Sequence, residues 1–481
     1  MEQRLSSIKA ELCQIRQDRT RYVKADEVLK LYLQFQDALV GISPSDRKDN
    51  DKLISDIMLL LSLSFITVGF TRHITSQYAR ALTLRMLFMF LIADPAFTFK
   101  ELQVLKSSLD RLKDASQGDD GTEAPVIPLI KERYMALVSE IEEWYDKVST
   151  VISQLPETVW PIHNQVIHLR RDILAEVINP EFSKSRLEQY GNKLRKIQFH
   201  MAQSEEEPSP IVEYQIKKAF TLVEYFSNGI SKADIEAEDP QLYPIFTTLR
   251  ETLSEIDVFV LTRRWTMRCS DLFERMESLL NMESLLLVNT KCPSKLNQPT
   301  GPIRIDPSRK YWYLCTYVAR RTWALIFRLL DTTEPVSEAL SSIYNQLSTL
   351  RRCLVEVQEA GVSNHRELYP YQMKLDSLER LRVDGKFVVN GEIPPGQGLI
   401  NGLLAQCYDM ILELEVEIDE KQGDESENEN DYSDGYTDSD AASKITYSAD
   451  SLRSSYYDRD NDPEHEHTDD DHLADVPDAN E

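Results

Sequence analysis

The sequence predicts an all-α protein built as a bundle of long helices, and three observations lead to this class. Apolar residues recur at three- and four-residue spacing over most of residues 1–418, which is the period of a helix with one buried face. Only one segment, 381–393, has the composition of a strand pair. Fifteen glycines in 481 residues are too few for large barrels or Gly-rich phosphate loops.

The helical pattern begins near the N-terminus and continues through the chain. In residues 28–39, Val28, Leu31, Phe35 and Leu39 form one stripe. Residues 129–151 repeat the pattern, with Glu143 placed four residues before Lys147 on the charged face. The other helices are expected at 51–70, 74–93, 99–114, 158–178, 184–202, 210–228, 241–288, 310–330, 335–359, 366–382 and 397–418.

Polar and Pro-rich segments divide these helices into regions. The short hairpin at 381–393 is expected around the turn Asp384-Gly385. The predicted organisation is an N-terminal helical region 1–114, a linker 115–128, a first helical half 129–290, a Pro-rich connection 291–308, a second helical half 309–418 and a disordered acidic tail 419–481.

The cysteines and the apolar runs predict an intracellular protein. Six scattered cysteines form no Cys-x-x-Cys pair, as is usual in a reducing compartment, and no cleavable N-terminal signal is visible. The most apolar run, Ile57–Phe70, would span about 21 Å as a helix, less than the ~30 Å of a bilayer core. We therefore expect a soluble intracellular protein with no integral membrane segment.

Two segments 181 residues apart resemble each other without gaps. Between 162–197 and 343–378, ten of 36 positions are identical, including the twin Asn-Gln-x4-Arg-Arg phrases. Apolar positions such as Ile162, Val166, Leu169 and Ile173 form one stripe in the first copy. The repeat predicts two related helical-hairpin halves.

The Asn-Gln-x4-Arg-Arg hairpins, the phrase Val383–Phe387 and the following Ile393–Gln397 resemble a fungal family of uncharacterised proteins, domain of unknown function 2408. The resemblance covers most of residues 1–418 and leaves the tail outside. It implies an all-helical protein of the cytoplasm and nucleus, and it carries over no catalytic residue.

The duplicated basic residues are the first candidate site. If the hairpins pair symmetrically, they line a groove for a phosphate or an acidic peptide, because Arg offers a rigid bidentate fork. The alternative is that they form ion pairs with neighbouring helices or cover apolar surface with their stems. The residues are Arg170, Arg171, Lys193, Arg351, Arg352 and Lys374.

A basic and aromatic stretch at 307–330 is the second candidate. Such stretches stack on nucleic-acid bases or lie on membrane surfaces, but the same spacing is also the buried stripe of a central helix with arginines at its edge. The net charge of −26 argues against nucleic acid. A peripheral membrane role is the weaker possibility. The residues are Arg309, Lys310, Trp312, Arg320, Arg321, Trp323 and Arg328.

The acidity of the protein belongs to its tail. Residues 419–481 hold 22 Asp or Glu against four basic residues, and their low hydrophobicity predicts disorder. Ser426, Thr437 and Thr468 each have an acidic residue three positions downstream, which suits acid-directed kinases. The tail is either a solubilising segment or a regulated one that covers the basic stretches near 263–328 and competes with an acidic partner.

Known catalytic patterns are not found: there is no Walker A, zincin, nucleophile-elbow or kinase motif, and no cofactor or metal is indicated. The leading interpretation is a non-enzymatic scaffold or adaptor that binds a protein partner and carries a phospho-regulated tail. The alternative is a helical small-molecule or phosphate-binding protein that uses the paired Arg-Arg/Lys hairpins.

Overall fold

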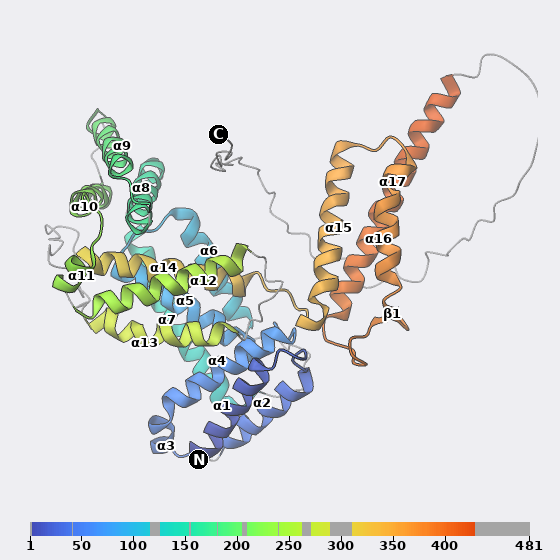
Figure 1. Ribbon diagram of the computed structural model, residues 1–481, viewed down its shortest axis with the longest axis horizontal. Helices are drawn as coiled ribbons and strands as arrows, with labels where there is room; N and C mark the ends of the chain where they lie inside the picture. The colour runs from blue at the N-terminus through green and yellow to red at the C-terminus, as the bar shows by residue number, and fades with distance from the viewer. Residues whose placement is uncertain are drawn as a thin grey trace, which may run out of the picture. The chain divides into compact units, whose positions relative to one another are not determined.

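A computed structural model describes residues 2–40, 42–115, 126–152, 155–179, 181–203, 209–238, 240–261, 271–288 and 310–428. Within these residues the chain forms seventeen α-helices, short 3-10 turns and one two-stranded hairpin (Figure 1). The all-α class predicted from the apolar spacing is therefore confirmed.

A first hydrophobic core extends from Leu5 to Leu330. Its most buried helices are α4 and α5, whose apolar residues are covered on nearly all sides, because α5 packs on α4, α7 and α14. The apolar run at Ile57–Phe70 thus lies inside a helical bundle. The core is formed by α1 (Glu2–Gln17), α2 (Ala25–Val40), α4 (Asp51–Thr67), α5 (Ile74–Ala93), α6 (Phe99–Ala115), α7 (Pro128–Ile152), α8 (Trp160–Ile178), α9 (Lys184–Gln203), α10 (Pro210–Tyr225), α11 (Lys232–Glu238), α12 (Leu242–Leu261), α13 (Leu272–Val288) and α14 (Lys310–Asp331), and the short α3 (Pro44–Asp49) packs on α4.

A second core, separate from the first, joins α15 (Ser341–Ala360), α16 (Tyr369–Glu379) and α17 (Gln397–Asn428). The strands β1 (Arg382–Val383) and β2 (Lys386–Phe387) form the predicted antiparallel hairpin beside these helices. Asp384 and Gly385 have φ of 50° and 74°, the left-handed pair that a two-residue type I′ turn requires. Phe387 anchors the hairpin because its side chain is fully buried in the core.

The structure also bears out the internal repeat. The 3-10 turn Glu157–Val159 leads into α8, and the turn Glu338–Leu340, 181 residues later, leads into α15. In each copy a second helix and then a third follow, α9 and α10 in the first and α16 and α17 in the second. Equivalent apolar positions are buried in both copies: Val166 and Leu347, Leu169 and Leu350, Ile173 and Leu354, Leu187 and Leu368, Leu194 and Leu375, Ile197 and Leu378.

Several boundaries differ from the expectation. Helices α1, α3 and α11 were not expected, and the segment 241–288 contains two helices, with 262–270 outside the described residues. Helix α14 packs in the first core, although its sequence position groups it with 309–418. Helix α17 continues to Asn428, ten residues past its expected end at 418, because the acidic segment still has helix-forming Glu and Lys residues. The disordered tail was predicted to begin at 419, so for residues 419–428, which are helical, the prediction was wrong. Residues 429–481 lie outside the described part.

Candidate functional site

The turn between α5 and α6 carries a carboxylate that two buried cations share. Asp94 caps the C-terminus of α5, and Pro95 prevents the helix from continuing. The Asp94 carboxylate accepts from Arg170 of α8 at 2.8 Å and from Lys218 of α10 at 2.6 Å. Both cationic side chains are only 2% exposed. This carboxylate therefore connects α8 and α10, two helices of the first repeat copy, to the end of α5.

A second carboxylate lies in the first turn of α6. Glu101 accepts from Arg171 at 2.5 Å and from Arg320 of α14 at 2.6 Å. The carbonyl oxygen of Ala96 accepts a further hydrogen bond from each of these two arginines. We call Asp94, Glu101, Arg170, Arg171, Lys218 and Arg320 the charged network.

Burial and neighbouring charges shift the pKa values within the network. Burial alone would raise the pKa of Asp94, but the charges of Arg170 and Lys218 hold it well below its usual range. The pKa of Glu101 likewise falls to about 2, since Arg320 and Arg171 outweigh its burial. Burial and the nearby Arg170 lower the pKa of Lys218 to about 8, although Asp94 opposes this. The two carboxylates therefore only partly compensate the four cations.

A pocket of about 210 Å³ opens over the charged network. All network residues except Lys218 line it, together with Tyr317 and Arg321 of α14. Apolar and small side chains complete the lining, among them Phe90 and Leu174. The fold thus brings together two groups that the sequence analysis kept apart, the Arg170-Arg171 pair and the Arg320-Arg321 pair. Asp94, Glu101 and Lys218 were not anticipated as partners, because no local pattern links residues that are 70 or more positions apart in the chain.

The other duplicated basic residues have different surroundings. Lys193 lies over the ring of Tyr190, with its Nζ 5.5 Å from the ring centroid. Arg351 donates to Gln406 at 3.4 Å and Lys374 donates to Gln346 at 2.6 Å. Arg352 is exposed. The two copies of the motif lie on helices of separate cores, so within the described residues they do not form one shared groove.

Most of the basic and aromatic stretch at 307–330 serves the first core. Trp312 and Trp323 are buried, which makes them part of the stripe of a central helix. Arg320 belongs to the charged network and Arg321 lines its pocket, whereas Arg328 is exposed. The side chain of Lys310 and all of Arg309 lie outside the described residues, as do Thr437 and Thr468. Of Ser426 only the backbone is described, as part of α17.

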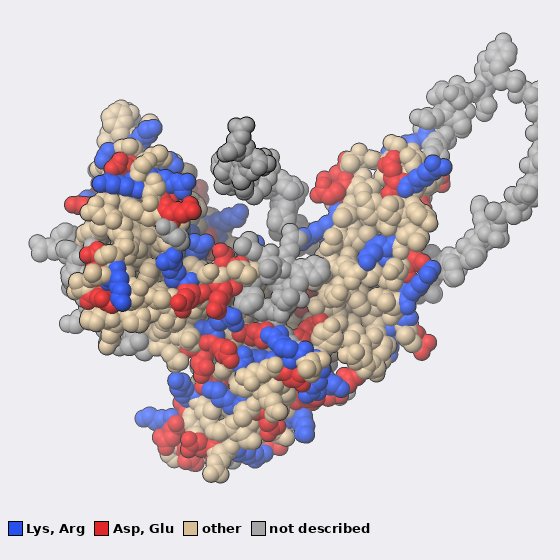
Figure 2. Space-filling model, in the orientation of Figure 1, with Lys and Arg blue, Asp and Glu red and all other residues tan. Residues whose placement is uncertain are grey.

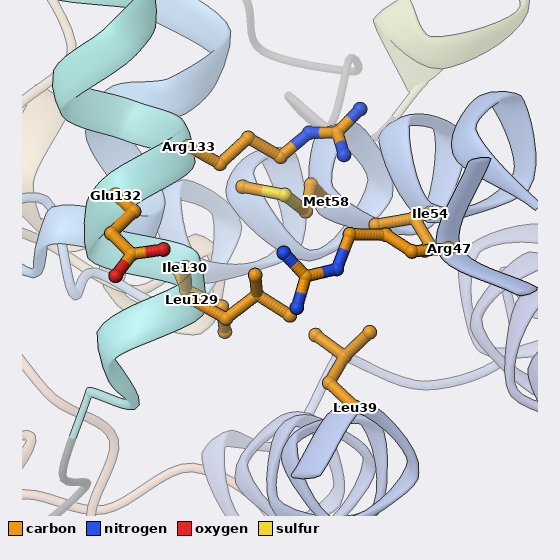
Figure 3. Close-up of a pocket in the computed structure, with 8 residues that line it drawn as sticks. All are labelled: Leu39, Arg47, Ile54, Met58, Leu129, Ile130, Glu132 and Arg133. Carbon is orange, nitrogen blue, oxygen red and sulfur yellow. The ribbon is translucent and has the colours of Figure 1, made fainter. Parts of the chain in front are cut away.

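A second pocket, of about 240 Å³, lies where α7 begins, beside α3 and α4 (Figure 3). Apolar side chains from three helices surround it, and the charged groups of Arg47, Glu132 and Arg133 lie among them. Arg133 is paired with Asp51 at 2.8 Å and donates to Ser55 at 2.6 Å. This arrangement ties α7 to the start of α4.

Neither a metal-binding cluster nor a membrane-spanning helix is found among the described residues. These residues contain no group of three or more His, Cys, Asp or Glu side chains arranged to hold a metal ion. None of the described helices is long and apolar enough to cross a bilayer. Cys13, Cys315, Cys353 and Cys407 are free thiols.

The fold and the site define a large helical protein that carries a three-helix unit twice. Its two repeat regions, residues 152–269 and 333–439, match the family described as protein of unknown function, DUF2408. The resemblance drawn from the Arg-Arg hairpins is thereby confirmed over these two regions. The match does not include residues 1–151, and it reaches into the acidic tail, where no resemblance was expected.

Two fungal proteins are similar over most of the chain. A CUB1 family protein of Schizosaccharomyces pombe is 29% identical over 451 residues, 88% of this chain and 95% of the relative. The Cu(2+) suppressing and bleomycin sensitive protein 1 of Saccharomyces cerevisiae is 28% identical over 506 residues, 87% of this chain and 89% of the relative. No solved structure matches the chain.

Proposed function

We propose that this protein is a non-enzymatic adaptor, and that the second repeat copy binds an acidic segment of a protein partner through an open face of α15. The observation that carries this proposal is a difference between equivalent positions of the two copies. In the first copy this face of the helix is buried against the α5–α6 turn. In the second copy the described residues leave it partly or fully exposed.

Four equivalent positions display the difference. On α8, His163, Ile167, Arg170 and Leu174 are all buried. Their counterparts on α15 are Tyr344 and Ser348, which are half-buried, and Arg351 and Val355, which are exposed. Leu174 is 4% exposed, whereas its counterpart Val355 is 37% exposed. A face with the same pattern is thus covered by another segment in one copy, whereas in the other copy none of the described residues covers it.

The α5–α6 turn, which packs on this face in the first copy, indicates the chemistry of the partner. There the Asp94 carboxylate of the α5–α6 turn pairs with Arg170. The carbonyl oxygen of Phe97 lies 3.0 Å from Nε2 of His163. Among the described residues neither Arg351 nor its neighbour Arg352 forms an ion pair with a carboxylate. A segment with an acidic side chain beside an apolar one would supply what α15 lacks.

The surface around α15 suits such a role. Figure 2 shows few Lys, Arg, Asp or Glu side chains over α15, α16 and α17 in this view. Exposed Met373, Leu412 and Val416 add apolar area on the neighbouring helices. Interfaces are poor in charged residues at their centre, so a surface of this composition favours protein binding over solvation alone.

The acidic tail extends the proposal to regulation. Residues 419–481 supply an acidic segment of the same chain, which competes with the partner for basic surfaces. Phosphorylation at Ser426, Thr437 or Thr468 would add about −1.5 to −2 charge each and strengthen that competition. We place this role in the cytoplasm, with the nucleus as a second location, which imaging of the tagged chain tests.

Charge reversal at Arg351 tests the adaptor role. Affinity capture with the full chain should retain a partner that Arg351→Glu loses. Arg380→Glu is the matched control, because Arg380 is an exposed arginine of the same repeat copy. It caps the end of α16, and its carboxylate partner Asp376 lies one turn earlier in that helix. Reversing the acidic residue of the partner to Arg should restore binding to Arg351→Glu. Equal capture by both variants would remove the proposal.

The regulatory part has its own test. Removing residues 429–481, beyond the end of α17, should raise the affinity for the same partner and weaken its salt dependence. Unchanged affinity and unchanged salt dependence would show that the tail acts only as a solubilising segment.

A further inference from the structure

We propose that the pocket over the charged network binds a small phosphate-bearing anion, either inorganic phosphate or a compact phosphate monoester, through Arg171, Arg320 and Arg321. This inference concerns the first core and does not depend on the adaptor proposal. It rests on the charge, hydrogen-bonding capacity and size of the pocket.

The charge of the pocket is unbalanced. Four arginines line it, Arg170, Arg171, Arg320 and Arg321, against the two carboxylates of Asp94 and Glu101. Each carboxylate is already shared between two cations, since Lys218 also pairs with Asp94. Arg170, Arg171 and Arg320 are partly or fully buried and share these two carboxylates, whereas Arg321 is exposed. Buried cations that are only partly compensated are unfavourable. A phosphate monoester carries about −1.5 to −2 charge at neutral pH, which matches the excess of cations in the lining.

The arginines retain donors for such a ligand. Both hydrogen bonds described for Arg171 use Nη2, one to Ala96 and one to Glu101, so Nε and Nη1 can donate to a further acceptor. Arg321 interacts with the hydroxyl of Tyr317, and no described carboxylate pairs with it. The Arg171 side chain is 30% exposed, so an anion in solution can reach it. Arginine forks bind phosphate oxygens in pairs, which favours phosphate over a spherical anion such as chloride.

The size of the pocket limits the ligand. Its volume of about 210 Å³ far exceeds the roughly 10–15 Å³ that admits one water. It is nevertheless below the ~300–1,000 Å³ usual for drug-sized ligands and cofactors. A phosphate group fits, whereas a dinucleotide would have to extend into solvent.

Phosphate titration of the full chain, produced without tail phosphorylation, tests this inference. Isothermal titration and thermal unfolding should detect binding of inorganic phosphate or glycerol phosphate beyond the effect of chloride at equal ionic strength. Tighter binding of phosphate would identify the free ion as the ligand, and tighter binding of glycerol phosphate would identify an ester; both support the site.

Two variants of the same helix make the test specific. Arg321→Ala should weaken phosphate binding roughly tenfold or more, the effect of one charge-assisted hydrogen bond. Arg328→Ala should leave it unchanged, because Arg328 is exposed and does not line the pocket. Both variants should unfold at the temperature of the parent when no phosphate is present. The inference is overturned if phosphate acts no more strongly than chloride, or if the two variants bind phosphate equally.

Discussion

Replacing Glu101 by Gln should destabilise the protein by about 3 kcal/mol at neutral pH. The carboxylate pairs with Arg171 and Arg320, and its pKa falls from 4.5 to about 2. Each pKa unit corresponds to about 1.4 kcal/mol of differential stability. The conversion applies because the side chain is only 27% exposed. A loss of this size agrees with the roughly 3–5 kcal/mol that follows removal of one partner from a buried ion pair.

The pH dependence gives the sharper test. Because the folded-state pKa is depressed, the contribution of Glu101 is complete above pH 4.5 and is lost as the pH falls toward 2. Urea unfolding of parent and Glu101→Gln should therefore differ by about 3 kcal/mol at pH 7 and by roughly half of that or less near pH 3. Glu143→Gln is the control, since Glu143 forms an exposed pair with Lys147 and should change stability by less than about 1 kcal/mol. A difference for Glu101→Gln that stays constant with pH would refute the reasoning.

Two further comparisons use matched positions. Arg170→Met should lower the free energy of unfolding by about 3 kcal/mol or more, because it removes a buried cation from Asp94. Arg351→Met at the equivalent position should change it by less than about 0.5 kcal/mol, because Arg351 is exposed. Equal losses of the two variants in urea unfolding would contradict the difference in burial. Gly396→Ala should destabilise by about 1 kcal/mol or more, because Gly396 has φ +105° and a Cβ there would lie 2.8 Å from the Cα of Val336. Gly398→Ala, with nothing within 4 Å, should be neutral or stabilising, and a thermal scan in which both variants behave alike would count against this backbone contact.

Local sequence was a good guide to the helices and to the repeat. The stripe through Trp312 and Trp323 marks a buried helix face whether or not its partner is known, and the structure buries both residues. The Asp384-Gly385 turn was predictable because a two-residue hairpin needs left-handed conformations that these residue types adopt easily. Features determined within one or two helical turns could thus be predicted.

The surroundings of the repeated arginines could not be predicted in the same way. Arg170 and Arg351 share the phrase Asn-Gln-x4-Arg-Arg, yet Arg170 is 1% exposed and Arg351 lies on the surface. The difference comes from the α5–α6 turn, which reaches Arg170 across 76 residues of sequence. Helix periodicity identifies the face that packs but not the segment that covers it. For the same reason the sequence did not predict that Arg171 and Arg320 both pair with Glu101.

Photo-crosslinking at equivalent positions tests most directly whether the second repeat copy holds an open docking face. A diazirine analogue of leucine would replace Val355 in one sample and Leu174 in another, each in the full chain. Position 355 should form adducts with an acidic segment of a second protein, or with the tail 429–481 when no partner is present, whereas position 174 should react only within the first core. If position 355 also yields only adducts within its own helical core, the α15 face is closed and the adaptor proposal fails.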